Sequence, residues 1–294
     1  MPMSEPKIPS DPTADLLDVL KLKRPSDTDF VGRTQWMPHG RVFGGQVLAQ
    51  SLVAAMQTLP ETRRVHSLHS YFLRAGDINQ EIRFEVEILR DGRSFSARRV
   101  KALQADKPIF VLSASFQDAA GGLEHQEQMP NNLPDPESLP SAKDLLGQLD
   151  HPATNYWANA RPFDLRHVTE PVYLKPAKEQ SADQMIWFRS IGEVPSDDAV
   201  QTAALAYASD YTILESILRK HGLSWAHPGL NTASLDHAMW FHEKPNVNQW
   251  MLYVQHSPSA SGGRGLAFGS IFSKDGKLLA SIAQEGMVRV PEYR

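Results

Sequence analysis

Hydrophobic and polar positions along the 294-residue chain repeat one arrangement twice, a helix followed by several strands. In the first half, Leu48, Leu52 and Ala55 recur at the spacing of one helix face, which predicts a helix over residues 42–56. Apolar residues alternate with glutamates over residues 84–88, as expected for a half-buried strand. The other elements predicted in this half are a short helix at residues 14–20 and strands at 30–36, 66–73, 81–90, 94–103 and 108–117.

The second half repeats this order. A long helical pattern covers residues 198–220 and predicts one continuous helix. The strands predicted after it lie at residues 232–241, 249–256, 265–272 and 277–290. Two short sequences also echo between the halves: residues 69–72 resemble 237–241, and residues 111–117 resemble 278–284. Two echoes in the same order indicate an internal duplication.

The turns between strands indicate how the strands pair. Asp91-Gly92 and Asp275-Gly276 are typical hairpin turns and favour antiparallel neighbours. A helix followed by antiparallel strands buries its apolar face against one side of a curved sheet. We therefore expect an α+β fold with two helix-wrapped antiparallel sheets side by side in one chain. Its parts are a flexible N-terminus at residues 1–13, a first domain at 14–118, a linker with short helices at 119–162 and a second domain at 163–294.

Composition excludes several classes of function. The formal net charge of −4 argues against a nucleic-acid partner recruited by a basic surface. No segment approaches the roughly 20 apolar residues of a membrane span, and the N-terminus lacks the apolar run of a signal peptide. The absence of cysteine excludes disulfides, thiolate metal sites and a cysteine nucleophile. A cytoplasmic protein is the simplest interpretation.

Two polar residues occupy positions that the pattern reserves for apolar ones. Asp210 stands in the middle of the apolar face of the long helix, where a carboxylate must be paired, hydrogen-bonded or protonated. A solvent-facing or purely structural aspartate fits the pattern equally well. Gln284 shares the phase of the apolar residues in the last strand, so its amide points inward. Such an amide is more often structural than catalytic, and Gln117 holds the corresponding place in the first half.

Asp236 and His237 form a tempting acid–base pair. Neighbouring residues of a strand point to opposite faces of the sheet, however, so the two cannot readily act on one substrate. The same alternation makes His237 and His242 a poor metal-binding pair. We interpret both histidines as structural.

Six stretches carry a resemblance to a known family. They are GRVFGGQ at residues 40–46, HSLHSYFL at 66–73, RDGRSF at 90–95, SDY at 209–211, ASLDHAMWFH at 233–242 and SIAQEG at 281–286. With these stretches in family order, the chain resembles the type II acyl-CoA thioesterases, the TesB-like double-hotdog enzymes, over about residues 15–290. The resemblance implies hydrolysis of fatty acyl-CoA to free fatty acid and CoA.

The resemblance also implies a site of three polar residues. The family combines an aspartate on the second helix, a threonine or serine before an Asp-His pair, and a glutamine in the last strand; Asp210, Ser234 and Gln284 match these places. Asp210 is expected to hold and deprotonate a water, while Ser234 and Gln284 fix its other hydrogen bonds. Many members have threonine where this chain has Ser234, and either hydroxyl can hold a water.

The remaining implications concern substrate and partners. Candidate walls of an acyl tunnel between helix and sheet are Tyr71, Phe72, Met239 and Trp240, each of which is equally plausible as core. No metal and no organic cofactor is implied, since CoA is part of the substrate, and a homo-oligomer is expected. Two alternatives stay open at this point: a non-catalytic acyl-CoA-binding hotdog protein, and an enoyl-CoA hydratase of hotdog fold. The second helix lacks the Asp-His pair expected of the hydratase.

Overall fold

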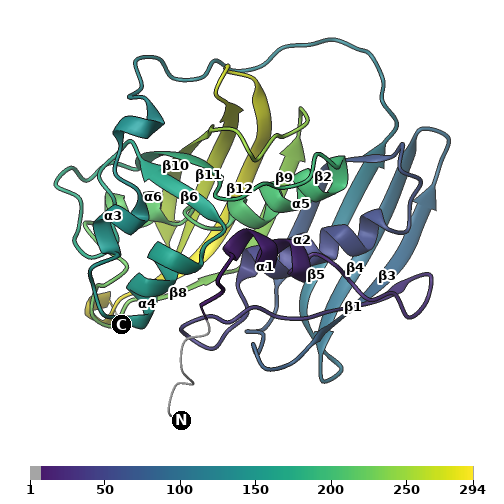
Figure 1. The fold of residues 1–294 in the computed structure, drawn as a ribbon, viewed down its shortest axis with the longest axis horizontal. Coiled ribbons are helices and arrows are strands. Elements are labelled where there is room, and N and C mark those ends of the chain that lie inside the picture. Colours follow the sequence, from purple (N-terminus) through teal and green to yellow (C-terminus); the bar gives the residue numbers. More distant parts are fainter. Residues whose placement is uncertain (1–7, 294) are drawn as a thin grey trace.

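Twelve strands join both halves of the chain into one antiparallel sheet (Figure 1) within residues 8–293, which the computed structural model describes. Residues 1–7 of the predicted flexible N-terminus lie outside the described residues. The elements of the first half are α1 (Pro12–Val19), β1 (Asp29–Gly32), α2 (Gly44–Met56), β2 (Arg64–Phe72), β3 (Ile82–Asp91), β4 (Phe95–Gln104) and β5 (Lys107–Gln117).

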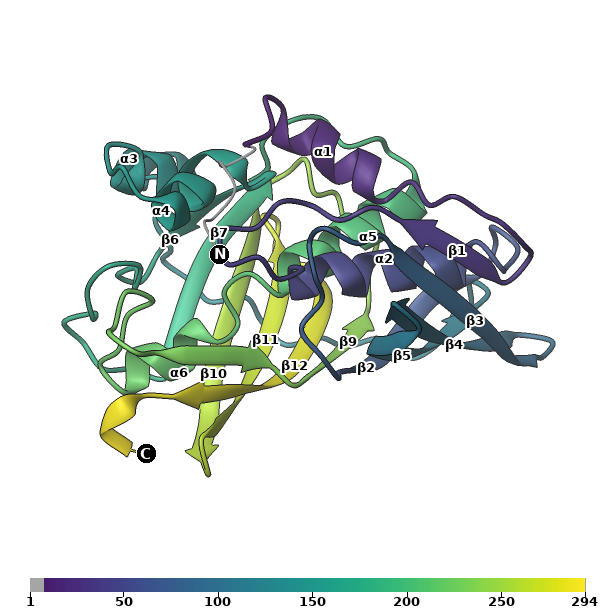
Figure 2. The same ribbon diagram turned by 90° about the horizontal axis from the view of Figure 1, so that it is seen from below.

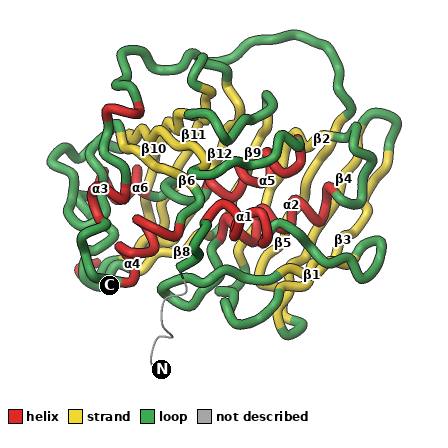
Figure 3. The backbone as a smooth tube through the Cα atoms, viewed as in Figure 1, coloured by secondary structure: helices red, strands yellow, loops and turns green. Residues whose placement is uncertain are grey.

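The second half begins with short helices and continues with the longer strands. Its elements are a 3₁₀ turn (Pro136–Ser138), α3 (Ala142–Leu146), α4 (Pro152–Asn155), a π turn (Tyr156–Ala160), β6 (Phe163–His167), β7 (Asp183–Ser190), α5 (Asp198–Ser209), α6 (Glu215–Lys220), β8 (Asn231–Ser234), β9 (Asp236–Phe241), β10 (Met251–Ser261), β11 (Arg264–Ser273), β12 (Leu278–Arg289) and a 3₁₀ turn (Pro291–Tyr293). A long loop without helix or strand leads from β5 to the second half (Figure 3).

The strand order shows the duplication. From one edge it runs β1-β3-β4-β5-β2, and from the other, after the extra strand β6, it runs β7-β10-β11-β12-β9. The two halves therefore place equivalent strands in equivalent positions. They meet where β2 pairs with β9, with Leu68 opposite Met239 and Ser70 opposite His237. The two sheets expected from the sequence are thus one continuous sheet, and the domain limits at residues 118 and 163 stay a prediction.

Helices α2 and α5 lie side by side on one face of this sheet (Figure 2). Residues 45–55 of α2 are all buried, because the helix packs against the sheet on one side and α5 on another. Each helix with its strands forms one hotdog unit. The α+β double-hotdog fold predicted from the sequence is confirmed.

The prediction of a single helix over residues 198–220 is wrong, because the segment between α5 and α6 is not helical. Asp210 caps the end of α5, and the N–H of Tyr211 donates to the carbonyl of Ala208, three residues back, at 3.2 Å. Asp210 nevertheless keeps dihedrals near the helical region, φ −86° and ψ −5°. The side-chain periodicity therefore continues across the break, and this is why the sequence pattern did not reveal it.

Several strands also differ from the prediction. β6 and β7 were not predicted, since Ile186, Trp187 and Phe188 of β7 are buried in succession and do not alternate. The reason is that residues of the linker cover the outer face of β7: the indole N–H of Trp187 donates to the carbonyl of Pro134 at 3.2 Å. The strand predicted at 232–241 is divided into β8 and β9, because β8 pairs only with β12 whereas β9 also pairs with β2.

Gly45→Ala should destabilise the protein, because α2 and α5 approach closely at this residue. A Cβ atom on Gly45 would lie 2.2 Å from the backbone oxygen of Tyr207 in α5, so one of the helices would have to move. We expect the free energy of unfolding to fall by about 1–3 kcal/mol, measured by urea denaturation. Gly121→Ala is the control, since nothing lies within 4 Å of its Cβ position. Equal losses in both variants, or none in either, would contradict this packing.

Candidate active site

Three polar residues from separate elements meet at the end of α5. Asp210 follows α5, Ser234 ends β8 and Gln284 lies in β12. The Nε2 amide of Gln284 donates to Oδ1 of Asp210 and to Oγ of Ser234, both at 2.9 Å. The Ser234 hydroxyl donates to the same carboxylate oxygen at 3.2 Å. The structure therefore brings together all three residues selected from the sequence, and their catalytic roles stay a prediction.

The first half of the chain contributes backbone to the same place. The N–H of Gly45, in the first turn of α2, donates to the Asp210 carboxylate. A Cβ on Gly44 would lie 2.5 Å from Oδ2 of Asp210, so only glycine leaves room for this approach. The positive end of the α2 dipole also favours a negative charge here. The backbone of α2 thus approaches Asp210 closely, and the carboxylate lies between the two halves.

Burial raises the pKa of Asp210 to about 6. Hydrogen bonds from Gln284, Ser234 and Gly45 favour the carboxylate and offset part of that effect. The residue as a whole is half-buried. At neutral pH Asp210 is mostly ionised, yet it is a much stronger base than an exposed aspartate.

His237 belongs to this cluster, although the sequence interpretation gave it only a structural role. It is completely buried, its Nδ1 contacts Oε1 of Gln284, and its Nε2 lies 3.0 Å from Oγ of Ser209. Burial lowers the pKa of His237 to about 4. The inward phase that it shares with Met239 could have suggested a place near Gln284, but the pairing of β9 with β12 is not visible in the sequence.

Asp236 and His242 lie apart from this cluster. Asp236 accepts a hydrogen bond from the N–H of Glu285 at 2.7 Å, and His242 is exposed with its Nε2 2.9 Å from Oγ of Ser281. Strand alternation separates Asp236 from His237, as expected. Neither residue contacts Asp210.

The four candidate wall residues divide between the two faces of the sheet. Phe72 lies beside the site, since its ring would be 3.0 Å from a Cβ on Gly44, and Met239 is buried beneath α5. Tyr71 and Trp240 are 61% and 38% exposed on the opposite, outer face. Because strand residues alternate, these two cannot line a space between the helices and the sheet in this chain.

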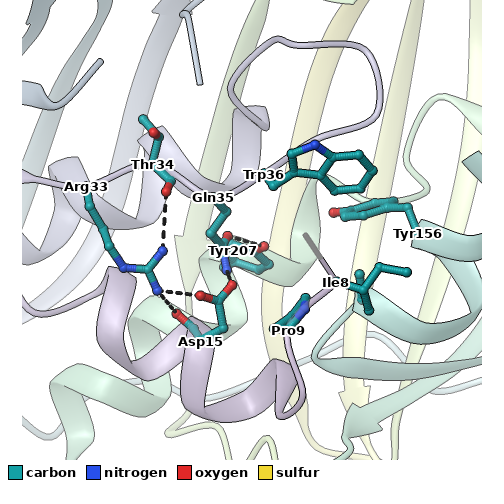
Figure 4. Close-up of a pocket in the computed structure, with 10 residues that line it drawn as sticks. Ile8, Pro9, Asp15, Arg33, Thr34, Gln35, Trp36, Tyr156 and Tyr207 are labelled. Carbon is teal, nitrogen blue, oxygen red and sulfur yellow. Dashed lines mark hydrogen bonds and ion pairs between the residues drawn. The ribbon is translucent and has the colours of Figure 1, made fainter. Parts of the chain in front are cut away.

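A separate cavity of about 320 Å³ is lined in part by Tyr207 of α5 (Figure 4). Its lining consists of Ile8, Pro9, Asp15, Arg33, Thr34, Gln35, Trp36, Tyr156, Ala160 and Tyr207. Several of these polar groups already pair with one another: the Tyr207 hydroxyl donates to Oε1 of Gln35, and the Gln35 amide donates to Asp15, each at 2.7 Å. The lining includes none of the three site residues, so we assign this cavity no part in the chemistry.

The part of the chain that the structure describes has no evident metal-binding site. Over residues 8–293, no three histidine, aspartate or glutamate side chains are grouped so that they could hold a metal ion. Within the same range, none of the helices has the length and apolar character needed to cross a membrane.

Comparisons with known proteins agree with the fold and with the family resemblance. Residues 33–117 match the acyl-CoA thioesterase N-terminal domain, and residues 163–287 match the acyl-CoA thioesterase family. Acyl-CoA thioesterase 2 of Haemophilus influenzae is 41% identical over 96% of this chain and 100% of its own. The crystal structure of the acyl-CoA thioesterase II TesB2 from Mycobacterium marinum is 38% identical, covers 95% of this chain and 100% of its own, and gives a TM-score of 0.77. The peroxisomal acyl-coenzyme A thioester hydrolase 1 of Saccharomyces cerevisiae is 29% identical over 94% of each chain.

The fold and these relatives define a double-hotdog thioesterase. The chain belongs to the acyl-CoA thioesterase family. It is an acyl-CoA thioester hydrolase. Membership of this family favours thioester hydrolysis over the two alternatives left open by the sequence, a non-catalytic binding protein and an enoyl-CoA hydratase.

Asp210→Asn should change how stability depends on pH. Folding raises the pKa of Asp210 from its ordinary 3.8 to about 6, so the folded state binds the proton more tightly than the unfolded state. Stability contributed by this residue is therefore present at low pH and is lost as pH rises from about 4 to about 6. The asparagine variant cannot ionise, so it does not lose this stability. Over this pH window its free energy of unfolding should rise relative to that of the wild type by up to about 3 kcal/mol.

Thermal and urea unfolding between pH 4 and 8 measure this difference. Asp27→Asn, at a fully exposed carboxylate, is the control and should follow the wild type. Parallel curves for the wild type and Asp210→Asn would show that folding does not perturb Asp210.

Proposed function

We propose that this enzyme hydrolyses fatty acyl-CoA to a free fatty acid and CoA through a water activated by Asp210 and positioned by Ser234 and Gln284. The proposal rests above all on the half-buried carboxylate, which burial makes more basic and two side chains hold in one orientation. A thioester carbonyl is electrophilic enough for direct attack by an oriented water. No covalent intermediate on the protein is required.

The water would lie against the Asp210 carboxylate and exchange hydrogen bonds with Ser234 and Gln284. A water that accepts from the Gln284 amide would replace one of its direct contacts with Asp210 or Ser234. Asp210 takes one proton while the water oxygen bonds to the acyl carbon. The tetrahedral intermediate then breaks its C–S bond, and CoA leaves as a thiolate that receives the proton from Asp210. The products are the fatty acid and CoA.

The N-terminus of α2 would stabilise the negative oxygen that develops on the acyl carbon. Gly44 and Gly45 bring the positive end of this helix to the carboxylate that holds the water. A carbonyl oxygen that faces this helix end would gain negative charge next to the positive end of the helix dipole. Phe72, beside Gly44, would contact the acyl chain close to the thioester.

Two further expectations remain proposals. A homo-oligomer would cover the outer face of the sheet, where Tyr71, Trp240 and Phe268 are exposed; light scattering in solution tests it. The cytoplasmic location expected from composition is tested by imaging the tagged chain, and a peroxisomal pattern would overturn it.

Asp210→Asn should abolish most of the turnover. Free-thiol release from short-, medium- and long-chain acyl-CoAs should fall by about 10²–10⁴-fold in kcat, the usual contribution of a general base. In the wild type, kcat/KM should rise with pH and level off above about 6, because Asp210 acts as the carboxylate, whose pKa is raised to that value.

Asp27→Asn, at an exposed carboxylate, should keep wild-type rates across the whole panel. Undiminished turnover in Asp210→Asn would rule out this residue as the base. A wild type that turns over no member of the panel would contradict the proposed substrate class.

A further inference from the structure

The side-chain amide of Gln284 is held from both ends. Its Nε2 donates to Asp210 and Ser234, and its Oε1 contacts Nδ1 of His237. An amide has a donor end and an acceptor end, so a rotation by 180° would reverse both sets of contacts. Oε1 of Gln284 would then face the Asp210 carboxylate, acceptor against acceptor.

The position of the hydrogen on the His237 ring determines which end of the Gln284 amide can form a hydrogen bond with Nδ1. Oε1 accepts only, so Nδ1 of His237 must carry the hydrogen. Complete burial keeps the ring neutral at pH 7, which leaves Nε2 without a hydrogen. Oγ of Ser209 lies 3.0 Å from this nitrogen and 2.8 Å from the carbonyl oxygen of Ala206, so its one hydrogen can be donated to either of them.

The backbone around His237 leaves the ring little freedom. Its carbonyl accepts a hydrogen bond from the Ser70 hydroxyl at 2.7 Å, and Ser70 is its direct neighbour where β2 pairs with β9. The ring therefore occupies a fixed place between α5 and β12.

During the reaction, hydrogen bonding to Asp210 alone no longer fixes the orientation of the Gln284 amide. While Asp210 is a carboxylate, it attracts the amide hydrogens and disfavours a rotated amide by itself. Once Asp210 has taken the proton from water, its O–H can donate to Oε1 of Gln284. The protonated carboxyl can then form a hydrogen bond with either orientation of the amide. His237 does not change its charge in this step and continues to require Oε1.

We propose that His237 is a positioning residue that fixes the orientation of the Gln284 amide throughout the reaction, with Ser209 in contact with its other ring nitrogen. This inference rests on the proposed function of Asp210 and Gln284. His237 does not touch substrate; it acts through Gln284, and its loss should reduce kcat while KM changes little.

Two substitutions at His237 separate hydrogen bonding from packing. His237→Leu fills the space but donates nothing, and should lower kcat by on the order of 10²-fold, the effect of a misplaced catalytic group. His237→Asn places an amide N–H near the position of Nδ1 and should recover most of the wild-type kcat. His242→Leu, at the exposed histidine just beyond β9, is the control and should match the wild type.

Ser209→Ala supplies an independent test that does not depend on whether His237→Leu folds. Removing the hydroxyl takes away the partner of Nε2 and loosens the hold on the His237 ring, and kcat should fall by up to about tenfold, the worth of one hydrogen bond. KM should stay near its wild-type value.

The outcomes distinguish this inference from the proposed function. Turnover that depends on Asp210 but is unchanged in His237→Leu and Ser209→Ala would overturn the positioning role alone. Equal losses of kcat in folded His237→Leu and His237→Asn would also overturn it, because the donor would then make no difference. Turnover that does not depend on Asp210 would overturn the proposed function itself.

Discussion

The structure depends on a carboxylate located where one central helix ends and the other begins. Asp210 closes α5 and accepts a hydrogen bond from Gly45 at the start of α2, so a single charge lies between the two halves of the chain. Removing this carboxylate from water is costly, and donors from Ser234, Gln284 and Gly45 compensate only in part. The remaining imbalance raises the pKa of Asp210 to about 6, which gives a base that is still ionised at neutral pH.

The duplicated fold uses its halves unequally around this charge. The second half supplies the side chains, and the first half supplies the backbone of Gly44 and Gly45. Side chains at these glycines would collide with Asp210 and with the backbone of Tyr207. The first central helix contains no acidic residue, so one site per chain follows from two similar units that meet at β2 and β9.

Local patterns predicted much of this arrangement. Period-two alternation located most strands, and the inward phase of Gln284 was correct because alternation is a property of each strand alone. The break after Asp210 escaped prediction because its dihedrals stay nearly helical. The role inferred for His237 depends on its contacts with Ser209 and Gln284, which come from distant parts of the chain. The echo of His69 with His237 indicated the duplication but not the environment of each ring, since His69 is exposed and His237 is buried.

The central claim is that water, not the protein, attacks the thioester. A single turnover in ¹⁸O-labelled water with enzyme in excess over acyl-CoA tests it most directly, with mass spectrometry of both the fatty acid and the peptide that contains Asp210. Direct attack predicts one ¹⁸O atom in the fatty acid and none in Asp210. Label in Asp210, with an unlabelled fatty acid from the first turnover, would instead show that the carboxylate itself attacks and forms an anhydride, and would contradict this account.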